Sequence, residues 1–341
     1  MTSLVEVAKA AGVSVSTASR VLTGSSHPIS AKTRAKVIAT AESLGYSPSA
    51  LARALVSRTS RVLGVLVSDI VNPYFSVIAR GVDDVASRAG YVTMLSNVDR
   101  STLTEINRLQ TMRDYRAAGV IIAGSGYVDD PHAPELAEAV RHTRDQGIRL
   151  VSLTVRDIGC PIVTADNHAA AHDITEHLIS LGHRRIAFIE GPGGMVTSRQ
   201  RREGFLACMS DAGLADAAQC LPGGFDHEAG HAATMRLIAR PPLPDAILAA
   251  NDEAAVGALN ALRQAGIDVP GEISVAGIDD LRVAQFVGLT TVSLPLYEMG
   301  AMAARHIIDT TTEPGKPTTT ILSHRLLPRE TTARRPSPTS A

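Results

Sequence analysis

Apolar residues follow two different patterns along this chain. In the first 60 residues they recur at helical spacing, whereas from Arg61 onward short apolar runs alternate with amphipathic stretches. The short runs lie at 62–67, 91–95, 120–123, 150–153, 186–189, 246–249 and 273–276. Strands that alternate with helices predict parallel sheets covered by helices on both faces. About 270 residues exceed the usual size of one such unit, so we expect two α/β lobes.

The beginning of the chain predicts a helix-turn-helix. Apolar residues at helical spacing lead up to Ala11, and Gly12 suits the left-handed residue that ends a helix. Ser14 is a suitable cap for a second short helix, and a third helix is expected at 30–44. In a helix-turn-helix the second helix enters the major groove of DNA. An ordinary helical hairpin in another small domain is the alternative.

The second helix carries a surface that suits close approach to DNA. Small hydroxyl residues and one arginine dominate the side expected to face the groove, which holds Val15, Ser16, Thr17, Ser19 and Arg20. Farther along, Ser47 and Pro48 begin another helix of about two turns. Because a helix this short is marginal alone in water, we expect a hinge that folds when it docks on DNA.

The distribution of charge also favours a nucleic-acid partner. Residues 1–60 hold seven basic and two acidic residues, whereas the whole chain of 341 residues has a net charge of -1. The three cysteines have no CxxC spacing, which indicates a reducing compartment rather than disulfides or a zinc site. Without a signal-like N-terminus or a membrane-length apolar run, we expect a cytoplasmic protein that has no membrane partner and lies on the nucleoid when bound to DNA.

Eight segments form an ordered set of motifs. VAKAAGVSVSTASRVL, TRAKVIATAESLGYSP and SALARAL lie in the first part of the chain, and DIVNPYF, HLISLGHRRIAFI, SRQRREGF, ANDEAAVGAL and ISVAGIDD follow. Together they resemble the lactose-repressor (LacI/GalR) family of bacterial transcription factors. The resemblance implies a three-helix head, a hinge helix and a core like that of periplasmic sugar-binding proteins, with two doubly wound parallel sheets.

The resemblance also implies where each part begins and ends. The head spans 1–46, the hinge helix and linker 47–60, the first lobe 61–162 plus 291–320, and the second lobe 163–290 plus 321–330. The chain then crosses between the lobes three times, near 162–163, 288–291 and 319–321. The remaining 331–341 are rich in proline, serine and threonine, which indicates a disordered tail.

For the second helix, the resemblance implies individual contacts with DNA. Val15, Ser16 and Arg20 correspond to the positions that read base edges, and an arginine can pair with guanine through two hydrogen bonds. Thr17 and Ser19 are expected on phosphates, which position the protein without reading sequence. The alternatives are that Val15 packs inside the head and that Arg20 is a solvated charge.

For the hinge, the resemblance implies insertion into the minor groove by a symmetric dimer. Leu55 corresponds to the leucine that enters the central base step and kinks the duplex. Ala54 is small and lets the two hinge helices approach each other. Without the resemblance, Leu55 is better explained as a residue packed on the core. A homodimer on double-stranded operator DNA is therefore expected.

In the core, the resemblance implies a small-molecule site between the lobes. Its residues would be Asp69, Asn72 and Phe75 from the first lobe, and Thr197, Arg201, Asn251 and Asp279 from the second. Phe75 suits stacking on an apolar ligand face, and the polar groups suit hydroxyls. Asp279 follows a predicted strand and opens a helix, so a helix cap is its alternative role.

One position departs from the family pattern. Thr154 lies where many relatives have an acidic residue, so the hydroxyl pattern or charge of the ligand differs from theirs. We include Thr154 among the effector-binding residues. The neighbouring Arg156 suits an anionic ligand.

Other constellations carry less weight. His168, His172 and Glu176 share one helical face, but they lack the further ligands of a zinc enzyme, so no metal is expected. The Gly-rich 191–194 lacks a phosphate-binding pattern and is better explained as a flexible loop. No Ser–His–Asp or Cys–His set appears at a telling position. We therefore expect no enzyme activity and no cofactor.

The combined prediction is a repressor of carbohydrate-utilisation genes that a small sugar-like inducer releases from its operator. One alternative is a regulator that needs a corepressor, such as a nucleobase. Another is a sugar-binding protein without a role on DNA, which the basic head argues against.

Overall fold

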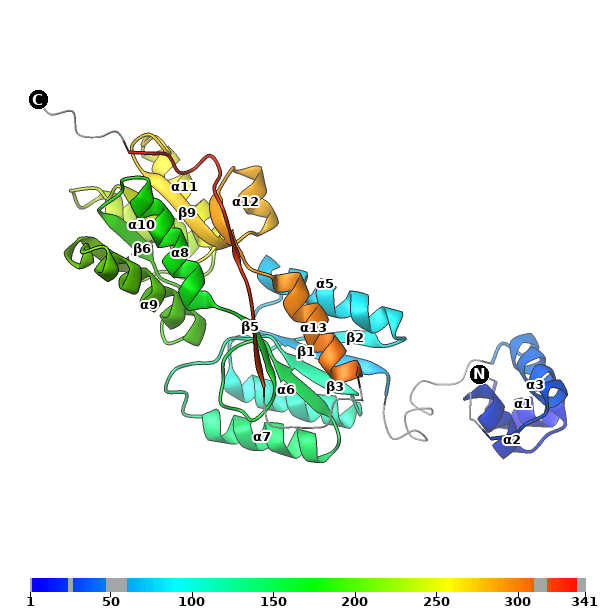
Figure 1. Cartoon of the computed structure of the whole chain (residues 1–341). Helices are drawn as coiled ribbons and strands as arrows, with labels where there is room; N and C mark the ends of the chain where they lie inside the picture. The colour runs from blue at the N-terminus through cyan, green and yellow to red at the C-terminus, as the bar shows by residue number, and fades with distance from the viewer. Residues whose placement is uncertain (1, 24–26, 47–59, 310–317, 336–341) are drawn as a thin grey trace, which may run out of the picture. The chain divides into compact units, whose positions relative to one another are not determined.

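The chain forms two compact units, which we describe separately (Figure 1). The computed structural model describes residues 2–23, 27–46, 60–309 and 318–335. A small helical unit is built on residues 1–61, and a large unit holds nearly all of the remaining chain. The predicted hinge helix, with Ala54 and Leu55, lies outside the described residues.

The small unit is the predicted three-helix head. It contains α1 (Leu4–Ala11), α2 (Val15–Leu22) and α3 (Ala31–Ser43). Ser3 and Glu6 form a reciprocal cap at the start of α1, and Gly12 ends it with φ 65°. Ser14 caps α2 by accepting from the Thr17 N–H. The apolar faces meet in a core of Val7, Ala8, Ala11, Ala18, Val21, Val37 and Ala41.

The first lobe of the large unit is a six-stranded sheet covered on both faces. Its elements in chain order are β1 (Val62–Val67), α5 (Pro73–Arg88), β2 (Val92–Asn97), α6 (Thr102–Asp114), β3 (Gly119–Ile122), α7 (Ala133–Asp145), β4 (Arg149–Ser152), β5 (Ile162–Ala165), α13 (Leu296–Ile308) and β11 (Thr319–Leu322). The strand order is β11-β5-β4-β3-β1-β2, and all pairs are parallel. Helices α5 and α13 cover one face, and α6 and α7 cover the other (Figure 1).

The second lobe repeats this architecture. Its elements are α8 (Asn167–Ser180), β6 (Ile186–Ile189), α9 (Val196–Asp211), the short 3-10 helix η1 (Ala215–Ala217), β7 (Ala218–Leu221), α10 (His227–Ile238), β8 (Ala246–Ala249), α11 (Asp252–Gln264), β9 (Ser274–Asp279), α12 (Arg282–Phe286), β10 (Thr290–Ser293) and β12 (Arg325–Leu327). The strand order is β12-β10-β9-β8-β6-β7, in which only β12 is antiparallel to its neighbour. The predicted pair of doubly wound parallel sheets is confirmed.

The chain passes between the lobes three times. Strand β5 belongs wholly to the first sheet and β10 to the second, so these two crossings follow Ala165 and Ser293. The third crossing lies between β11 and β12, after Leu322. Each crossing therefore falls a few residues beyond the expected position, because each strand completes its pairing before the chain leaves the sheet.

The beginning of the expected disordered tail is ordered. The Val275 N–H donates to the Thr331 carbonyl (2.8 Å), and the Thr331 hydroxyl donates back to the Val275 carbonyl (2.7 Å). Farther on, the Arg335 N–H donates to the Leu181 carbonyl (2.8 Å). The prediction was wrong for 331–335, because backbone bonds to the second lobe outweigh a composition that favours disorder. In the part of the chain that the structure describes, no helix is long and apolar enough to cross a membrane.

Candidate functional site

A cleft between the two lobes lies where the strands of both sheets end. The first sheet reverses strand order between β1 and β3, and the second between β6 and β8, so each has a crevice at the carboxyl ends of these strands. Seven of the predicted effector residues line the cleft: Asn72, Phe75, Thr154, Thr197, Arg201, Asn251 and Asp279. Its volume is about 470 Å³, including its open mouth.

A buried ion pair forms one wall of the cleft. The Arg201 Nη2 lies 2.8 Å from Asp279 Oδ1, and both side chains are only 2% exposed. The same guanidinium donates to Asn167 Oδ1 (2.9 Å) and to the Ala250 carbonyl. Asp279 has φ 124°, a strained backbone conformation for a residue with a side chain. Strain and buried charge at one residue make this wall a candidate functional site.

Burial dominates the electrostatics of this wall. Removal from water raises the pKa of Asp279 to about 6, although the Arg201 guanidinium acts in the opposite direction. Burial and the charge of Asp279 also raise the pKa of Asp252 well above its ordinary value. Asp252 accepts from the Thr291 hydroxyl (2.6 Å) and the Leu281 N–H (2.7 Å). These bonds hold the end of β9 and the strand β10 to the start of α11.

Two asparagines cap helices at the rim of the cleft. Asn72 accepts from the Tyr74 N–H (2.9 Å) at the start of α5, and Asn251 accepts from the Ala254 N–H (3.0 Å) at the start of α11. Their side-chain oxygens are therefore engaged in helix-capping hydrogen bonds. Helix α12 has Leu281 at its cap position and no side-chain capping bond. Asp279 is consequently not the cap of α12, and its carboxylate lines the cleft beside Arg201.

Asp69 differs from the other predicted residues, because it does not line the cleft. It lies 3.2 Å from Arg100 Nη2, and Arg100 does line the cleft. The other oxygen of Asp69 accepts from the Val71 N–H (3.1 Å). Sequence reasoning missed Arg100, which lies outside every motif.

Six further lining residues were also missed. Ser68 and Ala123 directly follow β1 and β3. Of the remaining four, Tyr74, Ser125, Met195 and Phe225 lie farther beyond the ends of β1, β3, β6 and β7. Tyr74 lies inside the DIVNPYF motif, so only its role was missed there. Ser125, Met195 and Phe225 lie between elements, and for Ser125 and Met195 the available signal was their position after a predicted apolar run.

Thr154 and Arg156 have structural partners in the first lobe. The buried Thr154 hydroxyl donates to the Gly124 carbonyl (2.9 Å). Arg156 pairs with Glu105 through two bonds of 2.8 and 3.0 Å, and both side chains are 6% exposed. The expectation that Arg156 meets an anionic ligand was wrong, because Glu105 already neutralises it.

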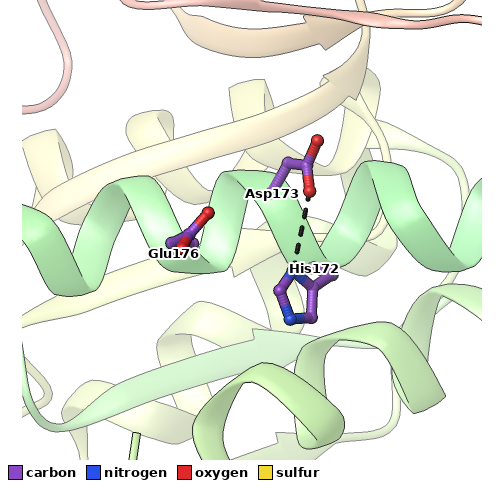
Figure 2. A group of neighbouring side chains, drawn as sticks. All are labelled: His172, Asp173 and Glu176. Atoms are coloured by element: carbon purple, nitrogen blue, oxygen red, sulfur yellow. Dashed lines mark ion pairs between the residues drawn. The ribbon is translucent and has the colours of Figure 1, made fainter. Parts of the chain in front are cut away.

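The histidine face on α8 forms a surface cluster (Figure 2). Ligand atoms of His172, Asp173 and Glu176 lie within 4.8 Å of one another, whereas His168 is not part of this group. The neighbours supply polar partners, since His324 Nε2 lies 2.9 Å from Asp173 and His172 Nε2 lies 3.8 Å from Asp211. Contacts between histidines and carboxylates on the protein surface explain why these side chains lie close together.

On the head, helix α2 presents the residues predicted to meet DNA. Val15, Ser16 and Arg20 are exposed, and Thr17 and Ser19 are half-buried. The Ser14 hydroxyl lies 2.9 Å from that of Ser16 and 2.8 Å from that of Thr17, so the start of the helix is a connected set of hydroxyls. Val15 is 43% exposed and is therefore not packed inside the head.

Comparison with known proteins extends these observations. The model for "Bacterial regulatory proteins, lacI family" matches residues 3–49, and that for a "Periplasmic binding protein-like domain" matches residues 175–332. The ribose operon repressor of Escherichia coli K12 is 33% identical over 319 residues, which cover 92% of this chain and 94% of that protein. The catabolite control protein A of Priestia megaterium is 32% identical over 304 residues, with 88% and 90% covered.

Solved structures agree in fold. A lac repressor dimer bound to operator and the anti-inducer ONPF has a TM-score of 0.85 at 27% identity and covers 97% of this chain and 99% of its own. The regulator CelR in complex with cellobiose has a TM-score of 0.68 at 30% identity, covering 97% and 100%. A LacI family regulator from Enterococcus faecium with bound ribose has a TM-score of 0.71 at 27% identity, covering 81% and 100%.

Head, cleft and similarity together define a DNA-binding transcriptional repressor with a periplasmic-binding-protein-like effector domain, which is not an enzyme. The chain belongs to the lacI family of bacterial regulatory proteins.

The buried ion pair generates a pH-dependent prediction. In Arg201→Gln, Asp279 loses the cation that favours its ionised form, so its folded-state pKa rises further above the unfolded value. The variant then loses stability as pH rises. We expect its free energy of unfolding to be about 3 kcal/mol below that of the original chain at pH 7.5, and this difference to shrink at pH 5. Urea denaturation at both pH values measures it. Arg202→Gln, which breaks a more exposed pair with Glu190, should cost less than about 1 kcal/mol. If Arg201→Gln lowered the free energy of unfolding equally at both pH values, Arg201 would not be the group that stabilises ionised Asp279.

Proposed function

We propose that this chain is a homodimeric repressor of carbohydrate-utilisation genes, released from its operator by a small uncharged sugar bound between the lobes. The observation that supports this most strongly is the balance of charge in the cleft. Arg201 is paired with Asp279, and Arg100 with Asp69. A cleft whose cations are already neutralised favours a polar ligand without charge, because an anion would have to displace a carboxylate.

The proposed contacts follow from the groups that face the cleft. Asp279 accepts from ligand hydroxyls while Arg201 holds it in place. The amide N–H groups of Asn72 and Asn251 and the hydroxyl of Thr197 add further hydrogen bonds, and Asn251 also donates to the Phe225 carbonyl (3.0 Å). Phe75 from the first lobe and Phe225 from the second, which both line the cleft, supply apolar faces for the ring of a sugar. Thr154 and Asp69 act indirectly. The Thr154 hydroxyl holds the Gly124 carbonyl, and Asp69 holds the Arg100 guanidinium.

A second candidate is corepression by a nucleobase. The aromatic rings of Phe75 and Phe225 also suit a flat heterocycle, and Asp279 and the two asparagines suit its edge. In either case the ligand shifts operator affinity only as far as its own affinities for the two states differ. The two candidates therefore differ in ligand class and in the sign of control.

A thermal-shift panel tests the ligand class. The full chain is heated with D-ribose, cellobiose, glucose 6-phosphate or hypoxanthine. We expect a neutral sugar to stabilise it, by about 2.7 kcal/mol at a concentration of 100 Kd. Asp279→Asn should remove the shift. Stabilisation by glucose 6-phosphate alone would contradict the uncharged ligand, and stabilisation by hypoxanthine would favour corepression.

For the head, we propose that Arg20 reads a guanine, with Val15 and Ser16 on neighbouring base edges and Thr17 and Ser19 on phosphates. Arg20→Ala should lose about 1–3 kcal/mol of discrimination at one base pair. Selection of binding sites from a random DNA pool measures this preference. The control Lys32→Ala, an exposed charge on α3, should weaken binding equally for all sequences. An unchanged preference in Arg20→Ala would contradict the role.

For the hinge, we propose that Leu55 enters the central base step and that Ala54 allows the two hinge helices to approach. Leu55→Ala should reduce the bend of the operator and its specific affinity, because less of the duplex is unstacked. The bend is measured by energy transfer between the ends of a labelled operator. The melting temperature of the core serves as the folding control. An unaltered bend would count against insertion.

A further inference from the structure

Three metal-ligating side chains share one turn of α8 in the second lobe (Figure 2). His172, Asp173 and Glu176 each offer one ligand atom, and these atoms lie within 4.8 Å of one another. We call these three residues the α8 cluster. Imidazole nitrogens and carboxylate oxygens together are donors that first-row divalent metals accept. The sequence did not favour a metal here, because His168, His172 and Glu176 had no further partners along the chain.

Two segments far away in the sequence supply those partners. Asp211 ends α9, and its Oδ2 lies 3.8 Å from His172 Nε2. His324 lies between β11 and β12, where the chain crosses between the lobes, and its Nε2 lies 2.9 Å from Asp173 Oδ2. The cluster is therefore a junction of α8, α9 and the third crossing.

The partners leave the right atoms facing each other. His172 Nδ1 lies 3.5 Å from Asp173 Oδ1, whereas Nε2 and Oδ2 of the same two side chains face Asp211 and His324. In metal sites, a ligating histidine or carboxylate is commonly held by a second group through its other polar atom. The α8 cluster has this arrangement at two of its three members.

The carboxylates around the cluster carry negative charge that no strong base neutralises. The ion pairs of Asp173 and Asp211 are with histidine, and within the described ranges no lysine or arginine pairs with either of them or with Glu176. Burial raises the pKa of the nearby Cys208 thiol to about 11, and the charges of Glu176, Asp211 and Asp173 act in the same direction. A divalent cation is favoured where three carboxylates converge in this way.

The spacing suits zinc after small side-chain rotations. Zinc binds histidine nitrogen and carboxylate oxygen at about 2.0–2.2 Å, so two ligand atoms of a tetrahedral site lie about 3.4 Å apart. His172 is half-buried, and Asp173 and Glu176 are exposed, so these side chains can close the remaining distance without movement of the helix.

We propose that the α8 cluster binds one zinc ion through His172 Nδ1, Asp173 Oδ1 and the Glu176 carboxylate, and that Asp211 and His324 position the first two ligands. A water molecule completes the tetrahedral set. None of these residues lines the cleft, so the proposal is independent of the ligand bound there.

Calorimetric titration of the metal-free full chain with ZnCl₂ tests the ligands. We expect one zinc per chain. His172→Gln and Glu176→Gln should each lower the affinity at least about tenfold, since even partners that only orient a ligand are worth about 10–100-fold. The control is His168→Gln, an exposed histidine one turn earlier on α8, which should leave the affinity unchanged.

Three outcomes would overturn the proposal. They are the absence of saturable zinc binding, an affinity that neither His172→Gln nor Glu176→Gln lowers, and an equal loss in His168→Gln. The melting temperatures of the metal-free variants show whether each one folds.

His324→Gln tests the link to the third crossing. It should lower the zinc affinity about 10–100-fold while the melting temperature of the metal-free protein stays the same, because His324 orients Asp173. The control is Ser323→Ala, at the exposed neighbouring position, which should change neither value. An affinity that His324→Gln leaves unchanged would remove the crossing from the proposed site.

Discussion

The buried pair of Arg201 and Asp279 is the interaction on which the effector domain depends. Two opposite charges removed from water are costly unless each finds its partners, and apolar side chains would fill the same space at no such cost. Arg201 reaches the end of β9, the residue after β8 and the first residue of α8. One side chain thus joins three chain segments at the carboxyl edge of the second sheet. Its position in the cleft wall gives a functional reason for keeping charges there.

The network extends from the cleft toward the crossings. Asp252 interacts electrostatically with Asp279 and accepts from the Thr291 hydroxyl in β10. Strand β10 ends where the chain crosses to the first lobe. At the start of α9, backbone bonds between residues 126–128 and 194–196 join the lobes directly. A ligand that changes the surroundings of Asp279 or of these bonds therefore acts on elements that join the lobes. Coupling between the effector site and the operator site requires only that the effector bind two conformations of the protein with different affinities.

Local signals in the sequence were sufficient for most of the fold. Gly12 and Ser14 end and begin helices as their chemistry predicts, and the alternation of apolar runs predicted both sheets. The order of residues 331–335 was not predictable, because it depends on backbone bonds to Val275 and Leu181, which are far away in sequence. Composition describes a segment alone and contains no information about such partners.

The site was predictable where motifs carried it. Asn72, Arg201, Asn251 and Asp279 were placed by resemblance, and they line the cleft. Arg156 was misjudged because its partner Glu105 lies 51 residues earlier in the chain. Ser125 and Arg100 were missed because they lie on loops whose positions are fixed only when the strands assemble.

The most direct test is the affinity of the full chain for its selected operator, with and without the sugar that stabilises it, at fixed salt concentration. The account predicts that saturating sugar weakens operator binding by a factor of about 5–150, the usual range of coupling between two sites. Operator binding that is unchanged or tightened by the sugar would contradict induction by a ligand in this cleft.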